Sequence, residues 1–318
     1  MPKDIVHWII ARRAAARLAD AVPALAADAA ACPNALLLGS IFPDAGFYLA
    51  KAAPAALHQL PRILHGSQGE DTFRLLRLHA ARLGPGPHQQ ARRAFLAGLV
   101  CHLASDITVH PFVYHHAGDP RADRRTTERH RLLETCLDMT AAGGLAGTAA
   151  HDLGRILDGL EAPLWELADA QGLAGLCGLD AATVRAGLDQ AWKRFRRVQR
   201  AIRRPWLAGL LLALRPRLPQ AGRSFAALFY GRRLEPAARA LGGPLRWVHP
   251  VTGEPGEATL ESFMDQSAAL AADWCRQLLA ALERGEPPLP QTGPGLGSGL
   301  PGVGSRQGRH FARPPFDV

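Results

Sequence analysis

The sequence is poor in the residues that build β-sheets. Aromatic residues make up 6% of the 318 residues and β-branched residues are sparse, whereas alanine, leucine and arginine are abundant. The abundant residues have high helix propensity, and the scarce ones are those that strands prefer. The composition therefore predicts an all-α protein and argues against a β-rich fold.

Cysteine is also scarce. The five cysteines are far apart and include no CxxC pair; they are Cys32, Cys101, Cys136, Cys177 and Cys275. An odd number of widely spaced cysteines argues against a disulfide framework. We expect free thiols and a reducing compartment.

Long apolar runs are missing as well. The amino-terminal run in MPKDIVHWIIARR is too short for a secretory signal, and no convincing small-residue cleavage site follows it. The run PWLAGLLLAL is shorter than the roughly 18 to 20 residues that a membrane-spanning helix needs. We expect no membrane anchor and a cytoplasmic protein.

What is present fits a globular chain, with 47% hydrophobic and 20% charged residues. The length suffices for a large core. We predict one all-helical domain over residues 1–285, with the chemistry in 1–140 and a helical extension in 141–285. Residues 286–318 are rich in glycine and proline, as in PGLGSGLPGVGS, which predicts a disordered tail.

The formal net charge of +9 suits an anionic partner, but arginine occurs in every segment, so a basic chain without such a partner is an equal alternative. Residues 192–206, WKRFRRVQRAIRRPW, form a basic amphipathic stretch with tryptophan at both ends. This stretch could make peripheral contact with an anionic membrane or with nucleic-acid phosphates. The solvated face of an ordinary helix is the interpretation we favour.

The chemistry-bearing residues gather between residues 98 and 134. His102, Asp106 and His110 follow one another at intervals of four, and His130 and Glu134 repeat that interval. On a helix such side chains lie one above another. Imidazole and carboxylate are also the ligands that hold zinc. We predict a metal site on two helices, the first spanning roughly residues 89–109 and ended by the proline at 111.

Three earlier residues extend the candidate set. His7 lies in a first helix that we expect Asp4 to cap, and His65 precedes a glycine-containing loop. Asp44 lies among apolar residues, where a carboxylate is costly to bury without a cation, although an Asx-turn is the simpler alternative. The candidate metal ligands are therefore His7, Asp44, His65, His102, Asp106, His110, His130 and Glu134.

The motifs MPKDIVHWIIA, GSIFPDAGFY, LHGSQGEDTF, GLVCHLASDITVHP and RHRLLE resemble the zinc-dependent phospholipase C family. That all-helical group is similar in architecture to the P1/S1-type nucleases. The resemblance implies two or three zinc ions and, from the well-studied members, secretion as the alternative location. It would place one ion on Asp44, His65, His102 and Asp106, a second on His110, His130 and Glu134, and a third on His7 with Asp106 as a bridge.

The sequence departs from the family pattern in two places. The secreted phospholipases complete their third zinc site with an amino-terminal tryptophan, whereas this chain starts MPKD. The alternatives here are that Asp4 completes the site, that the main chain at the start does so, or that the site is not completed. The gap between Asp106 and His110 is also shorter, although both side chains still converge on an unbroken helix. The residues that bind a choline headgroup in those enzymes cannot be matched one by one in this sequence.

The resemblance implies a phosphodiester hydrolase acting on a phospholipid, with a zinc-activated water attacking phosphorus. Asp44 would either ligate zinc or orient and deprotonate that water. One alternative is a P1/S1-like nuclease acting on single-stranded nucleic acid, which the basic charge favours modestly. The other is a helical binding protein that keeps the metal residues for stability and catalyses nothing.

Overall fold

The computed structural model describes residues 3–312 of the chain, and its fold is all-α, as predicted. The α-helices are α1 (Asp4–Ala21), α2 (Pro23–Ala31), α3 (Pro33–Gly39), α4 (Ala55–Leu64), α5 (Phe73–Ala80), α6 (Gln89–Ala117), α7 (Thr126–Ala141), α8 (Leu153–Asp158), α9 (Leu164–Leu167), α10 (Ala170–Cys177), α11 (Ala181–Ile202), α12 (Pro205–Leu214), α13 (Gln220–Ala226), α14 (Glu235–Ala240) and α15 (Leu260–Glu283). Short 3-10 helices are η1 (Phe42–Tyr48), η2 (Ala146–Ala150), η3 (Arg215–Arg217), η4 (Arg232–Leu234) and η5 (Ser305–Gln307). Strands β1 (Leu245–Val248) and β2 (Pro255–Ala258) form an antiparallel pair that the sequence did not predict.

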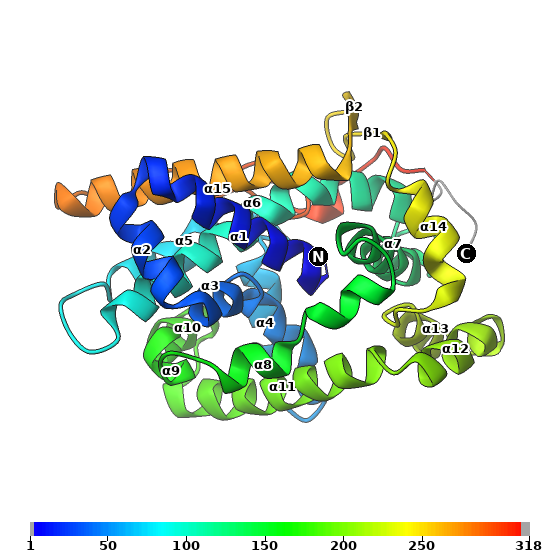
Figure 1. Ribbon diagram of the computed structural model, residues 1–318, viewed down its shortest axis with the longest axis horizontal. Helices are drawn as coiled ribbons and strands as arrows, with labels where there is room; N and C mark the ends of the chain where they lie inside the picture. Colours follow the sequence, from blue (N-terminus) through cyan, green and yellow to red (C-terminus); the bar gives the residue numbers. More distant parts are fainter. Residues whose placement is uncertain (1–2, 313–318) are drawn as a thin grey trace.

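Helix α6 is the centre of the core, and α1, α2, α3, α7 and α15 pack around it (Figure 1). Its sequence is rich in alanine and leucine on every side, which suits a helix enclosed by others. By length and hydropathy α6 could also cross a membrane, but 89% of its apolar window is buried inside the protein. Burial by neighbouring helices is what a core helix shows.

Two glycines let α3 and α6 touch along their backbones. A Cβ atom at Gly39 or Gly98 would lie 2.2 Å or 2.1 Å from a backbone oxygen of the other helix. Any side chain at these positions would force the two helices apart. The close approach brings the carbonyl of Ser40, just after α3, within 3.0 Å of Nδ1 of His102.

The prediction that the central helix ends at Pro111 is wrong, because α6 continues to Ala117. A proline has no N–H for the carbonyl four residues earlier, here Ile107. The carboxyl-terminal segment, residues 286–312, passes close to this carbonyl, since a Cβ atom built on Gly299 would lie 3.1 Å from the Ile107 oxygen. His110 therefore belongs to an unbroken helix.

The prediction of a disordered tail is wrong for residues 286–312, and residues 313–318 lie outside the described part. This segment packs against the core, where the backbone N–H of Leu296 donates to the carbonyl of His65 at 2.9 Å. Its glycines allow close backbone contact: a Cβ atom at Gly304 would lie 2.2 Å from the oxygen of Ser67. The glycine-rich composition, which is typical of a flexible linker, here allows the segment to pack closely against the core.

Candidate metal centre

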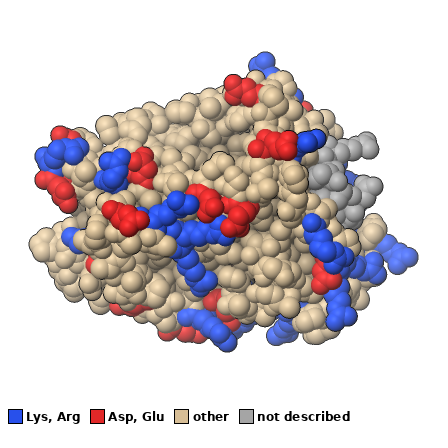
Figure 2. Space-filling view, turned by 45° about the horizontal axis from the view of Figure 1, so that its top comes forward, with Lys and Arg blue, Asp and Glu red and all other residues tan. Residues whose placement is uncertain are grey.

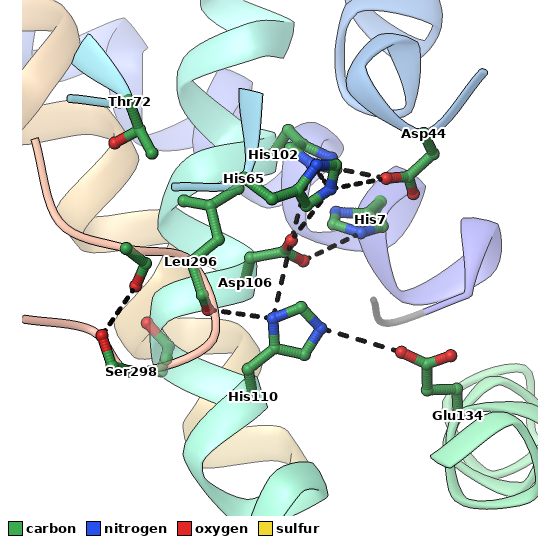
Figure 3. Close-up of polar contacts among 12 residues, drawn as sticks. His7, Asp44, His65, Thr72, His102, Asp106, His110, Glu134, Leu296 and Ser298 are labelled. Atoms are coloured by element: carbon green, nitrogen blue, oxygen red, sulfur yellow. Dashed lines mark hydrogen bonds and ion pairs between the residues drawn. The ribbon is translucent and has the colours of Figure 1, made fainter. Parts of the chain in front are cut away.

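The structure brings all eight predicted ligands together in three groups. Figure 3 labels seven of them, all but His130. Within each group the candidate ligand atoms lie within 4.8 Å of one another. The groups are His7, His102 and Asp106; Asp44, His65 and His102; and His110, His130 and Glu134. Helices α1, α6 and α7, the 3-10 helix η1 and the end of α4 supply them.

The group of Asp44, His65 and His102 is arranged as metal-binding residues are. Nδ1 of His65 lies 2.6 Å from the carbonyl of Pro61, and Nδ1 of His102 lies 3.0 Å from that of Ser40. Each Nδ1–H can donate to its carbonyl, which leaves both Nε2 lone pairs facing inward. The two Nε2 atoms are 3.4 Å apart, and Oδ1 of Asp44 is 3.0 Å from Nε2 of His65.

The pair of His7 and Asp106 tests whether these residues fit a metal. Both side chains are fully buried, with Nε2 of His7 3.4 Å from Oδ1 of Asp106, and the His7 ring stacks on His102. Among the described residues, both ring nitrogens of His7 and both carboxylate oxygens of Asp106 have no hydrogen-bond partner. Buried polar atoms are costly to leave unpaired. A cation between them would satisfy this donor set, so the residues fit zinc.

The third group lies between α6 and α7. Nε2 of His130 is 2.8 Å from Oε1 of Glu134, and Nε2 of His110 is 3.7 Å from the same oxygen. Nδ1 of His110 donates to the carbonyl of Leu296, at 2.9 Å, and also lies 3.6 Å from Oδ2 of Asp106. The carboxyl-terminal segment thus orients one ring of the group (Figure 3).

Burial sets the charge state of these side chains. It lowers the pKa of His102 and of His110 to about 4, so both imidazoles are neutral at pH 7. Burial would raise the pKa of Asp106, but its interactions with His110, His102 and His7 lower it well below its ordinary value. Burial likewise opposes ionisation of Asp44, yet His102 and His65 lower its pKa. Neutral imidazoles beside ionised carboxylates are the forms that bind divalent cations.

The sequence interpretation missed Asp138, which anchors the start of α1. Asp4 does not cap this helix, because α1 begins at Asp4 itself. Instead Asp138 of α7 accepts hydrogen bonds from the backbone N–H of Ile5 at 3.2 Å and of Val6 at 2.9 Å. The hydroxyl of Tyr230 donates to the same carboxylate at 2.6 Å. A carboxylate suits the free amides of a helix start, and it fixes α1 beside α7.

A sequence signal for Asp138 did exist, because His130, Glu134 and Asp138 continue the interval of four along α7. Asp4 is buried beside this carboxylate, and its Oδ2 atom has no partner among the described residues. Burial, with Asp138 as the next cause, raises the pKa of Asp4 to about 8. Asp4 lies outside the three groups of converging atoms, so its completion of a third metal site stays a prediction.

The sequence interpretation also missed Tyr114, although the same interval of four pointed to it. It follows His110 by four residues, and its ring lies 5.4 Å from that of His110 and 5.0 Å from that of His130, measured between centroids. Burial raises the pKa of Tyr114 to about 12, which keeps its hydroxyl protonated. The ring packs against two candidate ligands, whose own rings are 5.7 Å apart.

An all-helical protein with three adjoining histidine and carboxylate groups around its central helix has the candidate ligand set of a metal-dependent protein. The family model for zinc dependent phospholipase C matches residues 6–168, a span that holds all eight candidate ligands. This chain belongs to that family. No curated protein and no solved structure matches it.

Proposed function

We propose that this protein is a zinc-dependent phosphodiester hydrolase of phospholipase C type, acting on a phospholipid. The observation that carries the proposal is the fully buried pair of His7 and Asp106, whose side-chain nitrogen and oxygen atoms have no hydrogen-bond partner among residues 3–312 and which a cation would satisfy. Family membership supports the reaction class.

The ligands are assigned by group. Asp44, His65, His102 and Asp106 would hold one zinc ion, His110, His130 and Glu134 a second, and His7 with Asp106 as a bridge a third. Zinc, when bound, supplies Lewis acidity that lowers the pKa of water and neutralises charge on a phosphoryl group. The carbonyls of Pro61, Ser40 and Leu296 hold the imidazoles in the tautomer that this requires.

The chain's own residues would give the site a dry interior with one open side. Asp44 is 2% exposed, and its ionised carboxylate can hold a cation or accept a proton from a neighbouring water. His130 is the most exposed of the eight, with 17% of its side chain accessible. A phosphodiester would therefore approach from the side of α7.

Zinc content and a substrate panel test the proposal together. The purified protein should hold two or three zinc ions per chain and hydrolyse a chromogenic phosphocholine ester. Single-stranded DNA in the same panel tests the nuclease alternative. Zinc binding without hydrolysis of either substrate would favour the non-catalytic alternative, and near-zero zinc would contradict every metal-based interpretation.

Asp106→Asn is the sharpest variant, because the Asp106 carboxylate lies within 4 Å of histidines from all three groups and is the proposed bridging ligand. We expect this variant to bind at least one zinc ion fewer per chain and to hydrolyse substrate roughly 100-fold more slowly or worse. Its helical circular dichroism should be unchanged. Thr108→Ala on the same helix is the control, since its hydroxyl only donates to the carbonyl of Ala104. Hydrolysis at the parent rate in Asp106→Asn would show that Asp106 is not a ligand.

A further inference from the structure

Exposed large apolar side chains concentrate at one place on the described surface. Trp206 is 66% exposed, Leu210 49%, Leu214 37% and Phe225 40%, and the fifth such residue, Phe47, lies elsewhere. The first three follow at intervals of four on α12, so they form one stripe along the helix, and Phe225 is on α13, which packs against α12. We call these four residues the apolar stripe.

The same part of the chain carries the protein's entire positive excess. Residues 190–234 contain 12 lysine and arginine residues and no acidic residue. The rest of the chain has 25 basic and 28 acidic residues, a net charge of −3, out of totals of 37 and 28. Figure 2 shows blue side chains at the end of the molecule where Figure 1 places α12 and α13. The charge is therefore a local feature of this end.

The arginines around the stripe are available to a partner. The exposed ones are Arg200, Arg204, Arg217, Arg232 and Arg233. Among the described residues, none of the five forms an ion pair with a carboxylate. Unpaired guanidinium groups around exposed aliphatic and indole side chains are the composition of a surface that lies on an anionic bilayer.

The first part of the basic stretch, on α11, has its aromatic side chains buried rather than exposed. On α11, Trp192 and Phe195 are turned into the core, so the prediction that residues 192–206 as a whole could form a membrane face is too broad. The aromatic residue available at the surface is Trp206, where α12 begins. The apolar surface thus starts at the point where the predicted stretch ends.

We infer that the apolar stripe and its arginines form a docking surface for an anionic lipid membrane. A second copy of this chain fits poorly, because pairing the face with itself would bring guanidinium groups against guanidinium groups. Nucleic acid would use the charge but not Leu210 and Leu214, which offer neither hydrogen bonds nor a stacking plane. The acyl and headgroup boundary of a bilayer uses both.

One helix of this surface packs on a helix that supplies candidate metal ligands. Helix α13 packs on α7, where Arg131 donates to the carbonyl of Ser224 at 3.0 Å and Thr135 to that of Ala227 at 2.8 Å. These two residues flank His130 and Glu134 on α7. Docking here would bring α7, which carries His130 and Glu134, close to the lipid. The inference concerns binding alone, so it can hold whether or not the proposed hydrolysis does.

Vesicle co-sedimentation tests this. The zinc-loaded protein should bind phosphatidylcholine vesicles containing phosphatidylglycerol, bind pure phosphatidylcholine vesicles much less, and be released as salt rises from about 0.05 M to about 0.5 M. Leu210→Ser should weaken binding roughly tenfold. Arg204→Glu combined with Arg217→Glu should weaken it roughly tenfold or more. Each variant should keep the parent rate on a water-soluble short-chain phosphodiester.

Arg74→Glu is the matched control for charge reversal, because Arg74 is an exposed arginine on α5, outside this surface. This variant should bind vesicles about as tightly as the parent. Absent vesicle binding, equal binding to neutral and anionic vesicles, or variants that bind like the parent would overturn the inference. So would a concentration-dependent dimer that Leu210→Ser dissociates, since a second copy would then be the occupant.

Discussion

His79 shows what a buried histidine looks like in this protein when it has no chemical role. Its Nδ1 donates to the carbonyl of Leu75 at 2.9 Å, and its Nε2 accepts from the backbone N–H of Asp169 at 3.3 Å. Both ring nitrogens are satisfied. His7, equally buried, satisfies neither among the described residues. Burial alone therefore does not mark a ligand, whereas unsatisfied nitrogens facing carboxylates do.

His79 also makes the protein's stability depend on pH. Burial lowers its pKa from 6.5 to about 4, so below pH 6.5 the unfolded chain takes up a proton that the folded chain does not. Stability contributed by His79 is thus complete above pH 6.5 and falls as the pH drops toward 4, by up to ~3 kcal/mol. In urea unfolding of the chelator-treated protein, His79→Gln should show a smaller decrease over this window than the parent.

The chelator removes metal from both proteins, so titration of the candidate ligands affects them equally. His88→Asn serves as a control: it replaces an exposed histidine with a residue that tolerates the positive φ of 61° at this position. It should keep the parent's pH dependence. An unchanged slope in His79→Gln would mean that another group controls stability between pH 4 and 6.5.

At this scale the sequence predicted much of the candidate site, because an interval of four on a helix is a local property. As that interval requires, His102 and Asp106 share one group, and Nδ1 of His110 lies 3.6 Å from Oδ2 of Asp106. The carbonyl of Leu296 could not be predicted, since a backbone oxygen has no residue type and reaches His110 across 186 positions of the chain. Asp138 could have been found from the spacing, but not its role, which depends on where α1 begins.

Among the elements, the contact of α3 with α6 positions the first candidate group. Gly98→Ala would place a Cβ atom 2.1 Å from a backbone oxygen of α3. We expect a loss of about 1–3 kcal/mol in the free energy of unfolding and weaker zinc binding, because Ser40 would move away from His102. Denaturant titration and competition with a zinc chelator measure the two effects.

Gly175→Ala on α10 is the matched control, because a Cβ atom there meets nothing within 4 Å. That substitution should leave zinc affinity unchanged and raise stability by about 0.5–1 kcal/mol through helix propensity. If Gly98→Ala behaves like Gly175→Ala, the helices can separate without cost, and the glycine contact does not position the site.

The carboxyl-terminal segment supports a second prediction about elements. A chain ending at Glu286 loses both contacts of Leu296, to His65 and to His110. Because the His110 ring then lacks the acceptor that orients it, zinc affinity should fall roughly 10- to 100-fold at one site. Zinc content after dialysis against a graded chelator series would show the earlier release of one ion.

A chain ending at Ala312 retains every contact described above and should release zinc as the full-length protein does. If the chain ending at Glu286 also does so, the segment covers the site without orienting it. If all its zinc is lost together with its helical signal, the segment is needed for folding, and the more local change Gly297→Ala, whose Cβ atom would meet Tyr114 at 2.9 Å, separates the two roles.

Helices were predictable from the sequence to the extent that their signals are local. The start of α6 at Gln89 follows from glycine and proline before it, whereas its continuation beyond Pro111 depends on long-range packing that compensates a lost hydrogen bond. The prediction that the glycine-rich segment is disordered was wrong for a similar reason. Composition reports how freely a segment moves by itself, not whether a surface exists on which close backbone contact is favourable.

Over the whole molecule, the net charge of +9 conceals two regions of opposite sign. Twelve basic residues and no acidic one lie within residues 190–234, and the remainder has a net charge of −3. Summed over the chain this looks like an evenly basic protein. Only the folded arrangement shows that the basic region surrounds exposed Trp206 and Leu210, which turns a weak compositional signal into a specific surface.

The whole fold closes around the candidate ligands, so its stability should depend on zinc. If the folded chain binds the ion and the unfolded chain largely does not, a thousandfold excess of zinc over the dissociation constant should stabilise the fold by about 4 kcal/mol. For a chain of this size that corresponds to a rise of about 10 °C in melting temperature.

Magnesium, which binds imidazole poorly, should not replace zinc. Differential scanning calorimetry of chelator-treated protein, with and without each ion, measures this, and His130→Ala should reduce the shift because it removes one ligand. Equal melting temperatures with zinc and with chelator would mean that the buried imidazoles and carboxylates balance one another unaided, and the metal centre would lose its physical basis.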